Sequence, residues 1–381
     1  MDSAQANKNR DNKTKKRKKA SFISKFGCFR SDFGVPTVET IAGDGNFDME
    51  SAFADANRRP THLVVTVNGI IGCAENWRYA AKQLLKKYPQ DVIVHCSESN
   101  SSTLTFQGVD KMGSRLADEV VSVIKRYPGL QNISFIGHSL GGLIARFAIA
   151  KLYSEGDGEC RRDEFKGRIA GLEPMNFITS ATPHLGSRGH KQAPAFCGSY
   201  TLEKAAARAS WLLGRSGKHL FLKDGNKKKP PLLLKMASDS DDLKFISALQ
   251  SFRRRVAYSN ARFDFLVGWS TSSLRHRSEL PKRKTLSRSD KYPHVINVEY
   301  AKAADTREET CLDPKVNRFK TTDVEEAMIR GLTKMSWEKV DVDFGGSKQR
   351  FWAHNTIQVN SYRMNSDGAD VIQHMVDNFL V

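Results

Sequence analysis

The sequence predicts an α/β fold in which a mostly parallel sheet carries helices on both faces and a cap-like insertion. Three observations lead to this expectation. Apolar runs of strand length alternate with amphipathic helical stretches from residue 61 to residue 180. One of these strands turns straight into a helix through a glycine-flanked serine, GHSLG. The alternation stops in residues 187–250, which is the natural place for an insertion.

Length and charge suggest how the chain is divided. It has 381 residues and a formal net charge of +18. We expect residues 1–60 to be a disordered basic tail and linker and residues 61–381 to be one domain, with 187–250 as its cap or lid. The segment KNRDNKTKKRKK, residues 8–19, has almost nothing apolar to bury. It is interpreted as a solvated tail, as a nuclear-import patch or as a segment attracted to anionic lipid.

Composition also limits the class of protein. No apolar run is long enough to span a bilayer, and the six cysteines are scattered without a CxxC pair. We therefore expect an intracellular protein, cytoplasmic or peripheral to a membrane, with nuclear or organellar targeting by the basic tail as an alternative. The scattered cysteines also fit reduced thiols better than a disulfide framework or a zinc site. The basic stretch 275–291 lacks interleaved aromatic residues, so it is interpreted as an exposed loop, and no nucleic-acid partner is expected.

The first half of the domain follows a strand–helix alternation. Residues 62–67 form a continuous apolar run, as expected for a strand that is buried on both faces of a parallel sheet. Apolar periodicity predicts a helix over 75–88, a strand over 91–96 and a long amphipathic helix over 107–127. Residues 29–59, which are acidic and contain glycine, are predicted to be a linker with little structure.

The turn at Ser139 follows an apolar strand and precedes a helical pattern. A strand that turns directly into a helix strains the residue between them, so its neighbours must be very small. Gly137 and Gly141 meet this need. The turn raises the serine oxygen above the end of the sheet and points the Leu140 N–H at a developing oxyanion. Ser139 is therefore the predicted nucleophile.

A glycine-rich loop, NGIIG at residues 68–72, ends the strand 62–67. A loop in this position can supply a second oxyanion donor. We assign that donor to the backbone N–H of Ile70, with Gly69 as the second choice. The alternative is an ordinary turn between a strand and a helix.

The second half of the domain contains the predicted cap and several late elements. Apolar helical pieces at 200–213, 218–222 and 230–236 either receive an acyl chain or pack in the core. Strands are expected within 175–180, 252–258, 295–300 and 337–344, and helices over 322–333 and 369–380.

Asp264 is the predicted acid. It lies on the turn after a late strand, between the candidate serine and the late histidines in the chain. Asp239, Asp241 and Asp242 precede a helical pattern and are better interpreted as capping and solvated residues.

His354 is the predicted base, because it lies on a loop between the last strand and the last helix. The competing residue is His374, which lies within that helix and off its apolar face, so its ring is expected to point along the surface. His184 follows the strand that comes directly after the nucleophile helix, and it is interpreted as a structural or pocket-lining residue. The order Ser139, Asp264, His354 matches that of α/β-hydrolases.

The segments HLVVTVNGIIG, FIGHSLGGLIARFA, ATPHLG, FDFLVGWSTSS and WAHNTIQV together resemble the serine esterase, or lipase-like, family of α/β-hydrolases, particularly its plant branch. The resemblance runs from about His62 to the C-terminus. It implies the α/β-hydrolase fold and hydrolysis of carboxyl esters, in particular of lipids, without a metal or cofactor. It maps the nucleophile onto Ser139, the base onto His354 and the acid onto Asp264. Many members have His-Gly where this chain has Asn68-Gly69, so the way in which the loop is held is an open question.

The expected function is hydrolysis of a lipid ester or another ester through an acyl-enzyme intermediate. An acyltransferase that uses the same site is one alternative. A non-catalytic protein that binds lipid or anionic membrane, with the basic tail in contact with the membrane, is another. A third alternative, a protein associated with nucleic acid, has only the net charge in its favour and is not the expected one.

Overall fold

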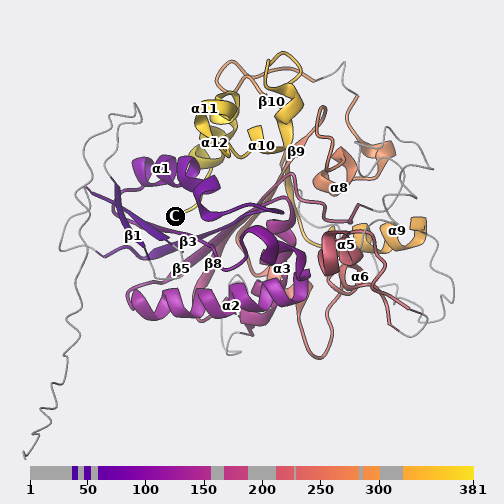
Figure 1. Cartoon of the computed structure of the whole chain (residues 1–381), viewed down its shortest axis with the longest axis horizontal. Coiled ribbons are helices and arrows are strands. Elements are labelled where there is room, and N and C mark those ends of the chain that lie inside the picture. The colour runs from indigo at the N-terminus through magenta and orange to yellow at the C-terminus, as the bar shows by residue number, and fades with distance from the viewer. Residues whose placement is uncertain are drawn as a thin grey trace, which may run out of the picture. The chain divides into compact units, whose positions relative to one another are not determined.

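The computed structural model describes residues 37–41, 47–52, 59–155, 167–187, 212–226, 229–282, 286–300 and 321–381 (Figure 1). All of these residues belong to one unit, Val35–Val381. The basic tail and residues 188–211 of the predicted cap lie outside the described residues, so the predictions for them stay predictions.

The described strands form one large sheet, in the order β1-β2-β4-β3-β5-β8-β9-β11-β10. The strands are β1 Thr37–Ile41, β2 Phe47–Ser51, β3 His62–Val67, β4 Val92–Cys96, β5 Asn132–His138, β8 Glu173–Ser180, β9 Arg254–Asn260, β10 Val295–Glu299 and β11 Glu338–Val342. The central strands of this order, from β4 through β3, β5, β8 and β9 to β11, are parallel to one another. At the two edges of the sheet, β1, β2 and β10 run antiparallel to their neighbours. A separate small pair joins β6, Tyr153–Ser154, to β7, Arg168–Ile169.

Helices cover both faces of this sheet. They are α1 Arg78–Lys87, α2 Val109–Arg126, α3 Leu140–Leu152, α5 Gly214–Leu220, α6 Leu232–Lys235, α7 Phe245–Gln250, α8 Trp269–Ser273, α9 Thr321–Leu332, α10 Ala353–Thr356, α11 Tyr362–Asn365 and α12 Ala369–Asp377. Figure 1 shows α2 and α3 over one face and α1 and α12 over the other. This is the α/β-hydrolase arrangement predicted from the alternation of strands and helices.

Strand β3 shows why the apolar run was continuous. Leu63, Val65 and Val67 pack into the core that includes α2 and α3. Val64, which points to the opposite face, packs into the core with α1 and α12. Because successive side chains of a strand point to opposite faces, a strand covered on both sides is mostly apolar. Its two polar residues, His62 and Thr66, are buried and hydrogen-bonded. The predicted buried strand is confirmed.

The prediction of an unstructured linker over residues 29–59 is wrong for residues 37–41 and 47–51. Strands β1 and β2 form an antiparallel hairpin there, and β2 extends the sheet by pairing with β4. Phe47 and Met49 of β2 are buried in the core on the α1 face. The apolar residues of this segment are few, but these two have a place to pack.

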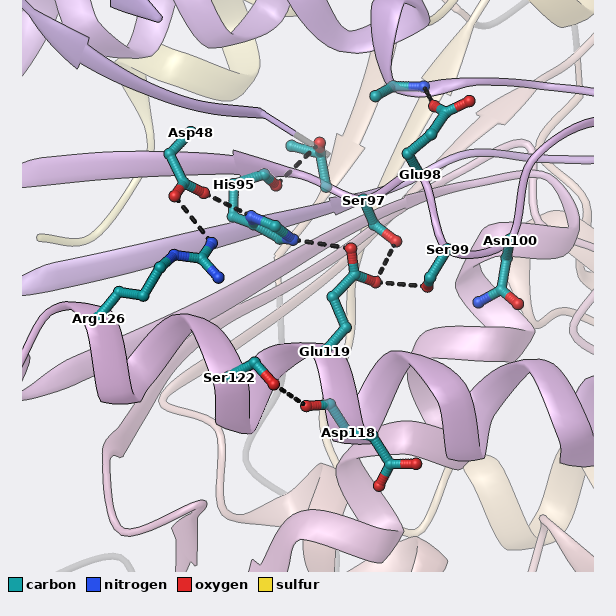
Figure 2. A network of polar contacts seen from close by, with 12 residues as sticks. Asp48, His95, Ser97, Glu98, Ser99, Asn100, Asp118, Glu119, Ser122 and Arg126 are labelled. Carbon is teal, nitrogen blue, oxygen red and sulfur yellow. Dashed lines mark hydrogen bonds and ion pairs between the residues drawn. The ribbon is translucent and has the colours of Figure 1, made fainter. Parts of the chain in front are cut away.

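A polar network holds the other side of the hairpin (Figure 2). Asp48 of β2 accepts hydrogen bonds from His95 of β4 at 2.6 Å and from Arg126 of α2 at 2.8 Å. The other ring nitrogen of His95 bonds Glu119 of α2 at 3.0 Å. Burial alone would lower the pKa of His95, but the two carboxylates raise it to about 9. A buried imidazolium between two carboxylates therefore joins the hairpin to α2.

The basic stretch 275–291 is not a loop that is exposed throughout. Arg275 is buried, and its guanidinium bonds Asp341 of β11 at 2.8 Å and Glu299 of β10 at 2.9 Å. A buried guanidinium keeps its charge, so it needs carboxylate partners, and here they come from the two strands at this edge.

The described residues of the predicted cap fall into two parts, one in the main core and one next to the candidate site. Helix α7 packs against α3, with the rings of Phe245 and Phe147 5.7 Å apart, and so belongs to the main core. Helix α5 and the residues that flank it lie next to the candidate site, as described below. None of the helices in the described ranges is long and apolar enough to cross a membrane.

Candidate active site

The carboxyl ends of four parallel strands bring the predicted site residues to one edge of the sheet. The loop with Gly69 follows β3, Ser139 follows β5, Asp264 follows β9 and His354 follows β11. The carboxyl ends of parallel strands form the usual ligand crevice of an open α/β sheet. The fold thus explains why residues more than 200 positions apart can meet.

Ser139 has strained backbone geometry, with φ at 53°. The turn is tight because the chain passes from β5 into α3 with no other residue between them. A Cβ atom at Gly137 would lie 2.6 Å from Gly142 Cα, and one at Gly141 would lie 2.2 Å from the carbonyl oxygen of Val67. Both distances are far below contact, so the two glycines that flank the serine are required by the turn.

The three predicted triad residues form one chain of hydrogen bonds. His354 Nε2 lies 3.0 Å from Ser139 Oγ, and His354 Nδ1 lies 2.9 Å from Asp264 Oδ2. All three side chains are almost completely buried. A serine, an imidazole and a carboxylate in this order are the arrangement that activates a serine oxygen.

The Asp264 carboxylate is held by four donors. Besides His354, Oδ2 accepts from Asn260 Nδ2 at 2.9 Å, while Oδ1 accepts from the N–H groups of Leu266 at 3.0 Å and Val267 at 2.9 Å. Burial would raise the pKa of Asp264, but the charge of His354 and these hydrogen bonds hold it below its usual value. Because an ionised carboxylate can only accept a hydrogen bond, His354 must carry its proton on Nδ1. Its Nε2 is then free to accept the proton of Ser139.

His138 is a site residue that the sequence interpretation missed. Its Nε2–H donates to the backbone carbonyl of His354 at 2.7 Å, and the two rings lie 4.7 Å apart. Burial lowers the pKa of His138 to about 3, so its ring stays neutral beside a base that must become charged. Its place next to the serine in GHSLG was the available signal.

Asn260 was missed as well. It ends β9, and its Nδ2 donates both to Asp264 and to the carbonyl of Ala353 at 3.2 Å. One amide thus ties the loop that carries the acid to the turn that carries the base. A polar residue at the carboxyl end of a late parallel strand was the available signal.

The oxyanion loop brings Gly69 against the serine: a Cβ atom at Gly69 would lie 2.8 Å from Ser139 Cβ. Leu140 is the first residue of α3, so its N–H has no partner within the helix. The next N–H along the loop, that of Ile71, is already bonded to Thr105 Oγ1 at 3.1 Å. Ile70 and Leu140 both line the cavity at Ser139, and their role as oxyanion donors stays a prediction.

The side chain of Asn68 stabilises the loop of residues 68–72. Asn68 lies at the position where many members of the family that the sequence resembles have histidine. The side chain is buried, and its Nδ2 donates to the carbonyls of Gly69 at 3.3 Å and Asn100 at 3.1 Å. The amide therefore ties the loop to the segment that contains Asn100.

The other candidate histidines lie away from Ser139. His374 is buried and bonds the Tyr258 hydroxyl at 2.9 Å, so the prediction of a ring along the surface is wrong. The reason is a polar partner from β9 that the helical pattern does not show. His184 is buried, bonds Thr179 at 3.0 Å and packs on Trp337, so it is structural and not part of the cavity wall.

The competing carboxylates are also accounted for. Asp239 accepts from the N–H of Ile246 at 2.7 Å and from the Ser247 hydroxyl at 2.6 Å, at the start of α7. This is the predicted capping role. Asp241 and Asp242 are exposed.

A cavity of about 410 Å³ opens at Ser139. It is lined by Gly69, Ile70, Gly72, Asn76, His138, Ser139, Leu140, Pro183, Ser187, Leu213, Leu220, Phe221, Phe265, Leu266, Val267, His354, Asn355, Gln358 and Asn360. Its wall is mostly apolar, and none of these described residues is Lys, Arg, Asp or Glu. Nowhere in the described ranges do three His, Cys, Asp or Glu side chains gather so that they could hold a metal ion.

Proteins named as putative lipases are among the relatives that comparison with known proteins gives. The chain is 30% identical over 221 residues to "Putative lipase ROG1" of Saccharomyces cerevisiae, a match that covers 57% of this chain and 29% of the relative. It is 25% identical over 248 residues to "Putative lipase C4A8.10" of Schizosaccharomyces pombe, covering 63% and 29%. The matched part of the chain thus spans less than a third of these curated relatives.

Solved structures show a looser likeness. A lipase-esterase related protein from Clostridium acetobutylicum is 11% identical, with a TM-score of 0.39 and coverage of 91% of this chain and 99% of that chain. The Pyrococcus furiosus esterase PF2001 is 16% identical, with a TM-score of 0.34 and coverage of 63% and 74%.

One protein family matches more than half of the chain. The match covers residues 57–274, which include the oxyanion loop, Ser139 and Asp264 but not His354. The chain belongs to the family described as "Putative serine esterase (DUF676)".

Proposed function

We propose that this lipase-like hydrolase cleaves carboxyl esters, in particular lipid esters, through an acyl-enzyme formed on Ser139. The observation that carries the proposal is the chain of hydrogen bonds Asp264–His354–Ser139 at the floor of an apolar cavity. No other group in the cavity wall combines a nucleophile with a base within hydrogen-bond reach among the described residues.

In the first half of the reaction, Ser139 Oγ attacks the ester carbonyl and gives its proton to His354 Nε2. Asp264 stabilises the imidazolium through the Nδ1–H bond of 2.9 Å. The N–H groups of Leu140 and Ile70 hold the oxyanion. His354 then gives the proton to the departing alkoxide, which leaves as the alcohol and leaves the acyl group on Ser139.

In the second half, a water molecule gives a proton to His354 and attacks the acyl carbonyl. The tetrahedral intermediate collapses, the proton returns to Ser139 Oγ, and the carboxylic acid leaves. The neutral ring of His138 supports this cycle, because a second positive charge 4.7 Å away would oppose protonation of His354.

A lipid substrate is supported by the apolar wall of the cavity. Leu213, Leu220 and Phe221 line it, and Leu266, which also lines it, is 59% exposed. Contact of the basic tail with anionic membrane and an intracellular location stay predictions from composition.

The test is turnover of p-nitrophenyl esters of graded chain length by the purified protein. We expect activity that rises with chain length beyond acetate and falls by roughly three orders of magnitude or more in Ser139→Ala. The matched control is Ser122→Ala, which removes an exposed hydroxyl from α2. Full activity in Ser139→Ala would refute the proposal. Transfer of the acyl group to an added alcohol in preference to water would favour an acyltransferase.

A further inference from the structure

One part of the cavity wall consists of carboxamide side chains: Asn76, Asn355, Gln358 and Asn360 all line it. We propose that this amide cluster binds the alcohol part of the ester and selects an uncharged alcohol that carries several hydroxyl groups, such as glycerol or a sugar. The inference rests on the proposed esterase function and names the substrate class of the same site.

The position of the amide cluster relative to the base assigns it to the alcohol part. His354 must give its proton to the departing alkoxide, so the alcohol lies on the His354 side of the scissile bond. Asn355 is the next residue in the chain, and Gln358 lies one turn further on. The apolar wall, with Leu213, Leu220 and Phe221 from the cap, is left for the acyl chain.

Two of the four amides have unused hydrogen-bonding capacity. Asn355 makes no side-chain hydrogen bond to the rest of the described chain. Gln358 is only 2% exposed, and its Nε2 has no hydrogen-bond partner among the described residues. A buried amide N–H without a partner is costly and calls for an explanation, which a substrate hydroxyl would supply.

The other two amides are held in place by each other. Asn76 Nδ2 donates to Asn360 Oδ1, and Asn76 Oδ1 accepts from the N–H of Cys73 at 2.9 Å. These bonds fix the orientation of the Asn360 amide and leave its N–H groups as donors. Asn76 follows the oxyanion loop, so the pair links that loop to the turn after His354.

The turn that carries the cluster is strained. Val359, between Gln358 and Asn360, is a buried β-branched residue with φ at 55°. This conformation is rare for such a side chain and is maintained only where the surroundings require it. It fixes the backbone direction on both sides of Val359, at the two positions that line the cavity.

The chemistry of the wall favours a neutral polyol over a charged head group. A carboxamide offers both donors and an acceptor, as a hydroxyl does. No Lys, Arg, Asp or Glu lies among the described lining residues, and the His138 ring is neutral. A phosphate or an ammonium group would lose its hydration there without gaining a counter-charge.

The experiment compares esters that share one acyl chain and differ only in the alcohol. We expect kcat/KM for 1-octanoylglycerol to exceed that for propyl octanoate by about tenfold, as two added hydrogen bonds would give. Gln358→Met and Asn355→Leu should each reduce this ratio by about threefold, since each removes one of the two added hydrogen bonds. Gln358→Met replaces a buried residue and could impair folding. Asn355→Leu, at a half-buried position, tests the same proposal with less risk of a folding defect.

Two controls separate the amide cluster from general effects. Gln373→Met makes the same exchange on α12, away from the cavity, and should leave both the activity and the ratio unchanged. Leu213→Ala should alter the preference for acyl length while leaving the alcohol ratio as it is.

Equal kcat/KM for the glycerol and propyl esters, or a ratio that both variants leave unchanged, would overturn the amide cluster as the alcohol site. A preference for 1-octanoyl-glycerophosphocholine would overturn the selection of an uncharged alcohol. In each of these cases, turnover of p-nitrophenyl octanoate would show that the proposed function still stands. Absence of turnover on every ester would overturn both.

Discussion

Replacement of Asp264 by Asn tests the proposed role of the acid without changing its shape. The carboxylate accepts from His354 and Asn260 on Oδ2 and from two backbone N–H groups, of Leu266 and Val267, on Oδ1. An amide has only one oxygen to offer these four donors. The question is therefore which pair of donors the amide oxygen keeps.

The energies of the two orientations decide this. Turning the amide oxygen toward His354 leaves the two buried N–H groups of Leu266 and Val267 facing an NH₂ group, at about 1–3 kcal/mol each. Turning the oxygen toward the backbone makes the NH₂ group face His354 Nδ1, which then must accept a hydrogen bond. The imidazole proton moves to Nε2, where it blocks transfer from Ser139 Oγ.

We therefore expect Asp264→Asn to fold and to lose about three to four orders of magnitude in kcat, or about 4–5.5 kcal/mol of transition-state stabilisation. The assay is turnover of a p-nitrophenyl ester, with the melting temperature as a check on folding. Asp118→Asn makes the same exchange at an exposed position on α2 and should remain fully active. If Asp264→Asn kept more than a tenth of the wild-type kcat, the assigned role of the acid would be wrong.

Three further predictions concern histidines. His354→Ala should lose roughly three or more orders of magnitude in kcat, whereas His374→Ala should lose stability through the Tyr258 bond but keep its turnover; the reverse result would contradict the site. His138→Phe should lower kcat about tenfold by removing the donor to the His354 carbonyl, while His138→Gln, which keeps an N–H donor, should recover part of it; equal kcat in both variants would show that the bond does not position the base. The folded pKa of His95, about 9, lies above its unfolded value, so its contribution of at most about 3 kcal/mol is present below pH ~6.5 and is lost as the pH rises through 9. Thermal unfolding should therefore show a steeper alkaline loss of stability in wild type than in His95→Gln, and parallel curves would contradict the charged network with Asp48 and Glu119.

Local patterns were sufficient for most of the fold. Strands such as β3 are buried on both faces, so their composition alone identifies them, and helices such as α2 reveal their apolar face through periodicity. Ser139 was predictable because the turn imposes a steric demand that only glycine neighbours meet. The proximity of Asp264 and His354 to Ser139 was predictable because the parallel sheet brings successive strand ends to one edge.

What was missed depends on partners that are distant in the chain. The hairpin β1–β2 docks through Asp48, whose partner His95 comes 47 residues later. His374 can be buried because its ring is hydrogen-bonded to the Tyr258 hydroxyl. Arg275 can be buried because the carboxylates of Asp341 and Glu299 neutralise its charge. The local sequence around a polar residue does not reveal a partner that is distant in the chain. Sequence patterns therefore predict that such a residue is exposed.

In the proposed mechanism, Ser139 becomes covalently acylated during turnover. Treatment of the purified protein with a fluorophosphonate, followed by intact mass measurement and peptide mapping, tests whether Ser139 is the nucleophile. We predict one adduct per chain, located on the peptide that contains Ser139, and no adduct in Ser139→Ala. Labelling that persists in Ser139→Ala, or an adduct mapped to another residue of the wild type, would contradict the assignment of the nucleophile.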